Sequence, residues 1–370
     1  MDTPTAPNRR HANDWLTVLG MAAVFLFHCA RYFNAEDWHV KNAVLSPLLS
    51  LFVQFVGQWA MPLFFLLSGM SASFSLRRRG AGEFLRNRAQ RLLLPFAFST
   101  LAASIPFQVW VERSSHGQFD GSFLDFYPHY FDGLYAFGGN FAWMGLHLWY
   151  LAMLFLFSLL VLPLAPLLRR TAPGAGPPLL ARGWAPLLWA LPLCGVELLV
   201  NLWPEGVGIR AFGGWSPAAY LAVFLTGCAL AGNQGLVQAL VRTRRPALVL
   251  ALAATAWLLL AQSGQGYAAL AAARACACWY WLAALLGLAS RHLGFATPWL
   301  GRARDAVLPF YVLHQTVIVG LGYAMQDWDL NVAAKFTLLA GLSLAGIGIL
   351  HAGVARVRAL RPLFGMRAAP

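Results

Sequence analysis

Ten stretches of about 20 mostly apolar residues run through the chain, and an α-helix of this length is what crosses the hydrocarbon layer of a membrane. In chain order they cover residues 15–33, 45–75, 91–111, 146–168, 185–203, 217–232, 246–262, 267–290, 305–325 and 333–355. Only 11% of the residues are charged, less than half of the about 25% found in average soluble chains. The sequence therefore predicts an all-α, polytopic membrane protein with about ten transmembrane helices.

The basic residues set the expected orientation of these helices. Most of the 27 lysines and arginines fall on one side of the predicted spans, in the tails and in alternate loops, and such residues mark the cytoplasmic side. We therefore expect both termini inside the cell (N-in/C-in), with a tail over 1–13, a transmembrane domain over 14–356 and a basic tail over 357–370. Arginines far outnumber lysines, as in GC-rich bacterial genomes, so we expect a multi-pass protein of the bacterial inner membrane that contacts its lipids.

The net charge of +13 does not indicate a nucleic-acid partner, because no basic run is interleaved with aromatic residues that could stack on bases. The five cysteines all lie in apolar stretches without histidines at zinc-ligand spacing. We interpret them as packing residues. The sequence thus predicts no nucleic-acid partner and no metal site.

The ionisable candidates inside predicted spans are His28, Glu197, Arg274 and His314, with His351 close to the cytoplasmic end of the last span. Ionisable side chains at membrane depth are costly and mark sites by default. His28 lies about 20 Å along the first span, too deep for an interfacial anchor. It can act as a base or form an ordinary hydrogen bond across helices, and the residues alone favour neither. Glu197 must be protonated or paired, with Arg274 or a histidine as the candidate partner.

Two further segments carry candidate binding residues. Arg86, Arg88 and Arg91 precede the third span, and the i, i+3 spacing of Arg88 and Arg91 predicts a shared helix face. That face suits a phosphate-bearing ligand, or it anchors the protein to anionic lipids. The outer loop 112–145 is rich in aromatic residues and includes His129. It can bind sugar faces or belong to the interfacial aromatic belt.

Several short stretches together resemble a known family. They are Asp-Trp-Leu at 14–16 with His28, Met-Pro-Leu-Phe-Phe-Leu-Leu-Ser-Gly at 61–69, Arg-Ala-Gln-Arg-Leu at 88–92, His-Leu-Trp-Tyr-Leu at 147–151 and Leu-Pro-Phe-Tyr-Val-Leu-His at 308–314, with further likeness over 36–42 and 119–143. In order and spacing they resemble the membrane-bound acyltransferase family 3, in particular its glucan-biosynthesis C-like branch.

The resemblance implies O-acyl transfer from cytoplasmic acyl-CoA, used as a donor substrate with no bound cofactor, to a hydroxyl of a carbohydrate or similar acceptor of the cell envelope. It implies that His28 is the catalytic histidine and that Arg86, Arg88 and Arg91 hold the donor phosphates. The expected substrate-binding residues are His147, Trp149, His314, Glu197 and His129.

One position departs from the family pattern. The family's first motif places an Arg, then ten residues, before the histidine, and here that position is Thr17. A catalytically inactive relative is therefore one alternative. The other is a permease or exporter of a saccharide or small metabolite, which would use the intramembrane His and Glu residues as a proton relay.

Overall fold

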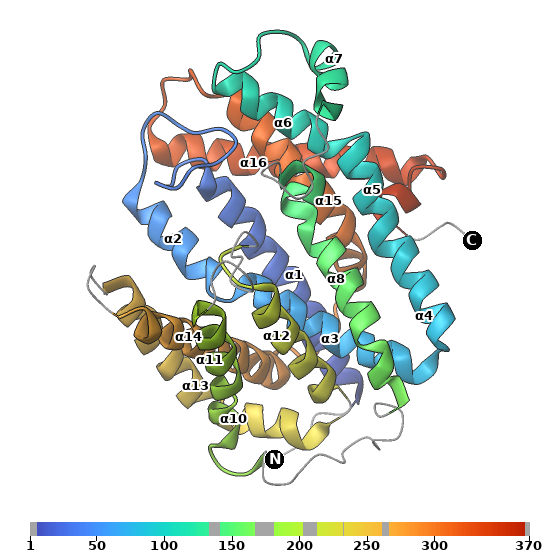
Figure 1. The fold of residues 1–370 in the computed structure, drawn as a ribbon, viewed down its shortest axis with the longest axis vertical. Helices are drawn as coiled ribbons and strands as arrows, with labels where there is room; N and C mark the ends of the chain where they lie inside the picture. The colour runs from blue at the N-terminus through green and yellow to red at the C-terminus, as the bar shows by residue number, and fades with distance from the viewer. Residues whose placement is uncertain are drawn as a thin grey trace. The chain divides into compact units, whose positions relative to one another are not determined.

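The computed structural model describes residues 6–132, 141–166, 181–202, 213–231, 233–260 and 266–366, and only the backbone of 6–10, 141, 201 and 202. Within these ranges every regular element is helical (Figure 1). The α-helices are α1 (Ala6–Arg31), α2 (Pro47–Gly57), α3 (Ala60–Arg78), α4 (Ala81–Arg88), α5 (Leu94–Leu101), α6 (Ser104–Ser115), α7 (Phe123–Phe126), α8 (Trp149–Leu160), α10 (Ala185–Leu188), α11 (Ala190–Leu202), α12 (Pro217–Leu230), α13 (Gln234–Leu260), α14 (Tyr267–His292), α15 (Leu300–Ala324) and α16 (Val332–Arg356). A π-helix, η1 (Ala89–Leu93), joins α4 to α5, and the 3₁₀-helices are η2 (Tyr127–Phe131), η3 (Phe141–Met144), η4 (Leu146–Leu148), η5 (Leu162–Leu164) and η7 (Pro362–Phe364).

The membrane-protein prediction is confirmed. Eight helical segments of the described chain are long and apolar enough to cross a membrane, and Ala185–Val200 and Pro217–Leu230 are shorter apolar helices. Together they correspond to the ten predicted spans. The second span breaks between α2 and α3, a few residues before Pro62, because proline is tolerated in the first turn of a helix but not in its interior.

Other sequence-based expectations stay predictions. The N-in/C-in orientation, the inner-membrane location and the tail boundaries at 13 and 357 are in this group. The sequence between the fourth and fifth predicted spans is rich in Pro and Gly over 171–184, which is typical of a linker. Most of this stretch lies outside the described residues, as does 133–140 of the outer loop.

The helices form two compact units, each built from separate parts of the chain. Unit 1 comprises residues 1–20, 54–85 and 157–304, and unit 2 comprises 21–53, 86–156 and 305–370. Helices α1, α2, α4, α8 and α15 each pass from one unit into the other.

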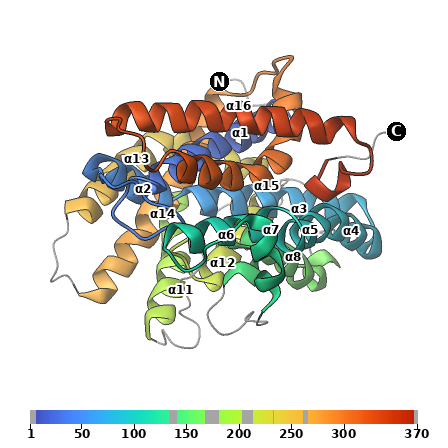
Figure 2. The ribbon, with the colours of Figure 1, turned by 90° about the horizontal axis from the view of Figure 1, so that it is seen from above.

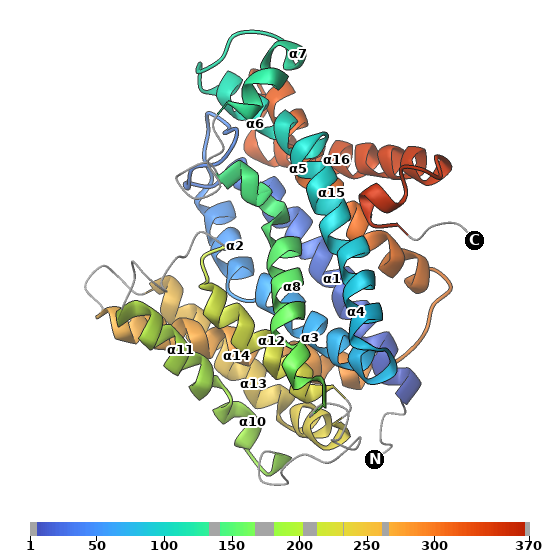
Figure 3. The ribbon, with the colours of Figure 1, turned by 45° about the vertical axis from the view of Figure 1, so that its right-hand side comes forward.

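Unit 1 is held together by close helix pairs. Helices α13 and α14 pack along each other and α11 packs on α14, as Figure 3 shows. Helices α3 and α12 approach so closely that a Cβ at Gly69 would lie 2.0 Å from the Phe224 carbonyl oxygen, and one at Gly227 would lie 2.1 Å from that of Leu66. Small residues at a crossing let two membrane helices bring their backbones together.

Unit 2 contains the C-terminal part of α1, the run from η1 through α6, and α15 and α16. Figure 2 shows α16 running beside α15, where a Cβ at Gly346 would meet Val317 at 3.3 Å. The segment after α16 folds back, and Phe364 of η7 packs on Phe98 of α5 with ring centroids 5.6 Å apart. This segment therefore contributes to the packing of unit 2.

Candidate functional site

His28 of α1 and His314 of α15 lie against each other inside unit 2. His314 Nε2 is 3.2 Å from His28 Nδ1, and the ring centroids are 4.8 Å apart. His314 is fully buried and His28 is half-buried. Two histidines that the sequence places 286 residues apart are thus one hydrogen-bonded pair within membrane-spanning segments.

Backbone carbonyls assign the proton positions of this pair. The Val24 carbonyl lies 2.9 Å from His28 Nδ1, and the Tyr311 carbonyl lies 2.7 Å from His314 Nδ1. A carbonyl only accepts, so each Nδ1 carries the hydrogen in the neutral rings. His28 Nδ1–H is then shared between Val24 and the His314 Nε2 lone pair. The lone pair of His28 is therefore on Nε2, the position needed for a base.

His147 is the third histidine of this cluster. Its ring centroid is 5.2 Å from that of His314, at an interplanar angle of 86°. The side chain is buried, and among the described residues neither ring nitrogen has a partner with hydrogen-bond geometry. The Val312 backbone also lies close to the ring. Buried polar atoms are normally bonded. Several other buried side chains of the described chain have one atom without such a partner, whereas His147 has two.

A strained turn presents His147. Gly145 has φ +81° and Leu146 has φ +45°, and Leu146 is the sole non-glycine residue with positive φ in the described parts of the chain. A Cβ at Gly145 would lie 2.6 Å from the Phe96 ring, so this position requires glycine. The left-handed conformation at Leu146 costs about 1–2 kcal/mol. The Tyr311 hydroxyl donates to the His147 carbonyl and fixes the end of the turn.

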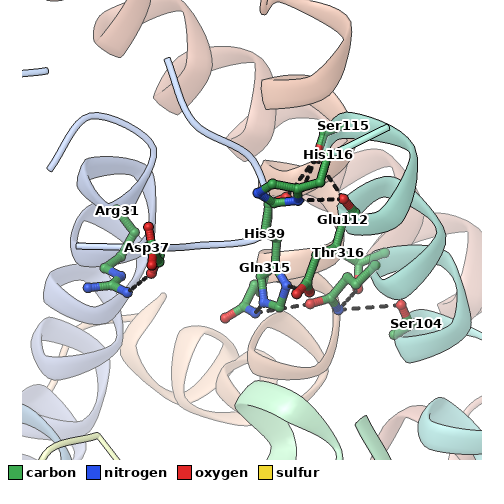
Figure 4. A network of polar contacts seen from close by, with 10 residues as sticks. Arg31, Asp37, His39, Ser104, Glu112, Ser115, His116, Gln315 and Thr316 are labelled. Atoms are coloured by element: carbon green, nitrogen blue, oxygen red, sulfur yellow. Dashed lines mark hydrogen bonds and ion pairs between the residues drawn. The ribbon is translucent and has the colours of Figure 1, made fainter. Parts of the chain in front are cut away.

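A second polar group in unit 2 centres on His39, in the loop between α1 and α2 (Figure 4). Its Nδ1 pairs with the Glu112 carboxylate of α6, and its Nε2 lies 3.0 Å from Gln315 Nε2 of α15. Ser115 Oγ donates to the His39 carbonyl at 2.9 Å. Two helices, α6 and α15, therefore fix both the ring and the backbone of His39.

The amides next to His39 form a directed chain of hydrogen bonds. Gln108 Nε2 donates to Thr316 Oγ1 at 2.6 Å and lies 3.4 Å from the Ser104 carbonyl. Its Oε1 therefore accepts from Gln315 Nε2, at 3.0 Å. The remaining hydrogen of Gln315 Nε2 then points to His39 Nε2, which accepts it while Nδ1–H faces Glu112. The geometry thus gives a carboxylate–imidazole pair.

Trp38 connects the two groups. Its ring centroid is 6.4 Å from that of His28 and 5.5 Å from that of His39. His39 also lies within electrostatic range of both His28 and His147. The four histidines are therefore one electrostatically connected cluster.

Lys41 ties the His39 loop to the end of α1. Its Nζ donates to the carbonyls of Arg31, Asn34 and Glu36 at 2.6, 2.5 and 3.0 Å, and to Asn34 Oδ1 at 3.0 Å. The Arg31 carbonyl is one of those that a helix C-terminus leaves without an intrahelical partner. Lys41 therefore satisfies the end of α1 and holds the loop against it.

Lys335 holds the same loop from the side of α16. This buried ammonium donates to Asn42 Oδ1 at 2.9 Å and to the Gln326 carbonyl at 3.1 Å. The Asn42 N–H in turn donates to the Tyr32 carbonyl at 2.9 Å. The loop that carries Trp38 and His39 is thus fixed to both α1 and α16.

The Lys41 side chain is expected to lose its proton at a lower pH than an ordinary lysine does. Burial, assisted by the nearby Arg31 charge, lowers the pKa of Lys41 to about 8, against about 10.4 for a free side chain. The neutral amine therefore becomes the major form above pH 8, and its labelling by an acylating reagent should rise with a midpoint near pH 8. Mass spectrometry distinguishes acylated Lys41 from acylated Lys335, which is the chain's other lysine and is buried. Lys41→Arg is the control that removes the signal, and a midpoint near pH 10 would contradict the expectation.

The predicted donor-binding arginines gather at the π-helix. Arg86 and Arg88 end α4, and Arg91 lies within Ala89–Leu93. The predicted shared face of Arg88 and Arg91 rests on α-helical spacing, and a wider π turn begins between them at Ala89. That shared face stays a prediction. Arg86 and Arg91 are exposed and Arg88 is half-buried.

Glu197 belongs to unit 1, so the structure does not group it with the histidines. It is fully buried in α11. Glu197 and Arg274 both lie within electrostatic range of Tyr220 and Cys278, which places the two expected partners in one neighbourhood. The Arg274 guanidinium also donates to the Gly214 carbonyl at 2.5 Å and lies over the Trp215 ring.

The remaining candidates lie in simpler surroundings. His129 is exposed in η2 and pairs with Asp132 at 2.9 Å, so the structure shows it as a surface residue of unit 2. Trp149 is buried at the start of α8, next to Tyr150. Thr17, at the family's arginine position, donates to the Asn13 carbonyl of its own helix at 2.8 Å. The side chains of Arg9 and Arg10 lie outside the described ones.

Sequence reasoning did not identify His39, Glu112, Gln108 and Gln315 as site residues. Two signals were present in the sequence. Gln108 and Glu112 are spaced i, i+4 and so share a helix face, and Gln315 directly follows His314. In the described parts of the chain, no group of His, Cys, Asp and Glu side chains has the geometry of a metal site.

Comparisons with known proteins point in one direction. The profile of a family described as "Acyltransferase domain" matches residues 10–352. Glucans biosynthesis protein C of Escherichia coli (strain K12) is 25% identical over 141 residues, which is 38% of this chain and 34% of that protein. The same protein from Salmonella paratyphi B (strain ATCC BAA-1250 / SPB7) and Salmonella heidelberg (strain SL476) matches with the same identity and coverage. The match thus spans about a third of these relatives, and no solved structure matches the chain.

Proposed function

The chain belongs to the acyltransferase family whose profile it matches over residues 10–352, and on this premise we propose that it is a membrane O-acyltransferase. It moves an acyl group from acyl-CoA to a hydroxyl of a carbohydrate acceptor of the bacterial cell envelope. The observation that carries the proposal is the His28–His314 pair, which leaves the lone pair of a neutral imidazole on His28 Nε2 inside a membrane-spanning helix.

His28 acts as the general base. Its Nε2 takes the proton of the acceptor hydroxyl as the hydroxyl oxygen attacks the thioester carbonyl carbon. The resulting imidazolium is stabilised at Nδ1–H by the Val24 carbonyl and His314 Nε2. When the tetrahedral intermediate collapses, the carbon–sulfur bond breaks, and the thiolate of CoA takes the proton back from His28. The cycle then ends with an ester, free CoA thiol and a neutral histidine.

The donor enters at the arginine end of unit 2. Arg88 and Arg91 lie about 20 residues before Glu112 along the run of helices from α4 to α6, which Figure 3 shows as a continuous path. At about 1.5 Å per residue this is about 30 Å, the thickness of the hydrocarbon layer. Guanidinium groups are suited to the phosphates of CoA. Phosphate binding on one side of the membrane and acceptor binding on the other fit this length.

The acceptor binds beside His39. Glu112 and Gln315 offer a carboxylate and an amide for sugar hydroxyls, and Trp38 offers an aromatic face next to His28. The name of the relatives, glucans biosynthesis protein C, agrees with a carbohydrate acceptor. These residues are better placed to bind the acceptor beside His28 than the exposed His129 of the outer loop is.

Binding of acyl-CoA to the purified protein tests the donor half of this proposal. A ligand at 100 times its Kd stabilises a protein by about 2.7 kcal/mol, so acyl-CoA should raise the thermal unfolding midpoint of the wild type. Arg88→Ala/Arg91→Ala should lose this shift. The matched control is Arg291→Ala/Arg302→Ala, which removes two exposed arginines of unit 1 and should keep it.

The same measurement separates the enzyme from a permease. A saccharide permease has no reason to bind acyl-CoA. If the wild type and both double variants unfold at the same temperature with and without acyl-CoA, the acyl-CoA donor is wrong.

A further inference from the structure

His147 is a buried ring whose hydrogen-bonding capacity is unused. Among the described residues neither of its nitrogens has a partner with hydrogen-bond geometry, although the side chain is only 7% exposed. A neutral imidazole always carries one N–H donor and one lone pair. Leaving this capacity unused in a membrane interior is costly, so the ring is suited to bind a ligand.

The ring is also neutral in this setting. Of the ion pairs in the described part of the chain, the two that involve histidine belong to His39 and His129. A charge on His147 would be buried next to His314 and close to His28 and His39. Without a carboxylate beside it, the charged form would be strongly disfavoured.

The backbone before His147 gives a second, independent sign of function. Gly145 and Leu146 both have positive φ, and Leu146 is a leucine in a conformation that side chains avoid. Strain of this kind persists where the surrounding structure imposes it, and it concentrates at active sites. Here it directs the residue that follows, His147, towards His314.

We propose that His147 is a catalytic residue whose N–H donates a hydrogen bond to the thioester carbonyl oxygen and to the oxyanion it becomes. The inference rests on the proposed function. When the hydroxyl attacks, the carbonyl π electrons move to oxygen, and the negative charge develops next to a donor already in place. His28 meanwhile holds the proton, so the base and the oxyanion donor are two different histidines on either side of His314. A neutral imidazole can serve as such an electrophile.

The stability of a variant separates this role from a structural one. Replacing an unsatisfied buried polar group with an apolar group of similar size is neutral or stabilising. His147→Leu should therefore unfold at the same temperature as the wild type or higher, and still lose about 10²- to 10³-fold in kcat, as expected for one lost oxyanion donor. His147→Gln keeps an N–H donor and should retain more activity than His147→Leu.

The deciding experiment is isotope-edited infrared spectroscopy of [1-¹³C]acetyl-CoA bound to the purified full-length protein. Donation by His147 polarises the carbonyl, so the wild type should shift its stretch to lower frequency. The shift should vanish in His147→Leu and partly return in His147→Gln. An unchanged shift in His147→Leu overturns the role of His147 and leaves the acyl-CoA donor intact. If the wild type binds no acetyl-CoA at all, both the inference and the donor assignment are wrong.

Discussion

Cells whose only copy of this protein carries His28→Ala are expected to lose about 10²- to 10⁴-fold in the rate of envelope acylation, the range that a general base contributes. The reason is specific to Nε2. His28 Nδ1 is already committed to the Val24 carbonyl and to His314, so Nε2 is the nitrogen that can take the acceptor proton. The measurement is the amount of ester-linked acyl groups that mild alkali releases from the envelope carbohydrate, per amount of protein in the membrane.

A matched pair of variants separates catalysis from folding. His28→Asn keeps an N–H that can donate to the Val24 carbonyl but has no base, so it should fold like the wild type and be as inactive as His28→Ala. His351→Ala removes a half-buried histidine of α16 and should keep full activity. Wild-type acylation by a normally expressed His28→Asn protein would show that His28 is not the base.

His314 should act only through His28. His314→Leu removes the acceptor for His28 Nδ1–H and should slow transfer on its own. In the His28→Asn background it should add almost no further loss, because residues that act as a unit are strongly non-additive. Independent losses that multiply would mean that His314 touches the substrate itself, as the sequence predicts.

The helices could be predicted from the sequence because hydrophobic length is a local property. Two of the predicted spans, 185–203 and 217–232, correspond to the shorter apolar helices Ala185–Val200 and Pro217–Leu230. Features that depend on backbone detail could not be predicted. Nothing in Ala-Gln-Arg-Leu-Leu marks a π-helix at 89–93, and nothing marks the positive φ of Leu146.

The candidate site was predictable only where one residue carries the signal. His28 and His314 stand out because each is an ionisable group in an apolar stretch. His39 and Glu112 do not, because each lies in a polar outer segment and its importance comes from its partner. Along the chain, His39 is 73 residues from Glu112 and 276 residues from Gln315. A single sequence carries no record of such pairing.

Gly69→Val and Gly227→Val are expected to abolish folding. Each glycine lies against the backbone of the opposite helix, at distances for a Cβ of 2.0 and 2.1 Å from carbonyl oxygens of Phe224 and Leu66. No side-chain rotation relieves a clash with backbone, so α3 and α12 would have to separate. That separation would also break the bond from Cys228 Sγ to the Gly69 carbonyl, at 3.2 Å. Overpacking a well-packed site costs typically 1–3 kcal/mol and occasionally more, and a two-helix backbone contact belongs at the upper end.

The control for this prediction is a glycine in an equally apolar helix with open space around it. Gly348 of α16 has no atom within 4 Å of a Cβ position, so Gly348→Val should elute from a size-exclusion column as the wild type does, while Gly69→Val and Gly227→Val should aggregate or fail to accumulate. The contrast gives a physical reason for one part of the family resemblance. Gly69 closes the stretch 61–69, where it resembles the family's second-span motif, and the structure explains that glycine by backbone contact, not by chemistry. If Gly69→Val folds normally, α3 and α12 are farther apart than described, and this part of the resemblance needs a functional explanation instead.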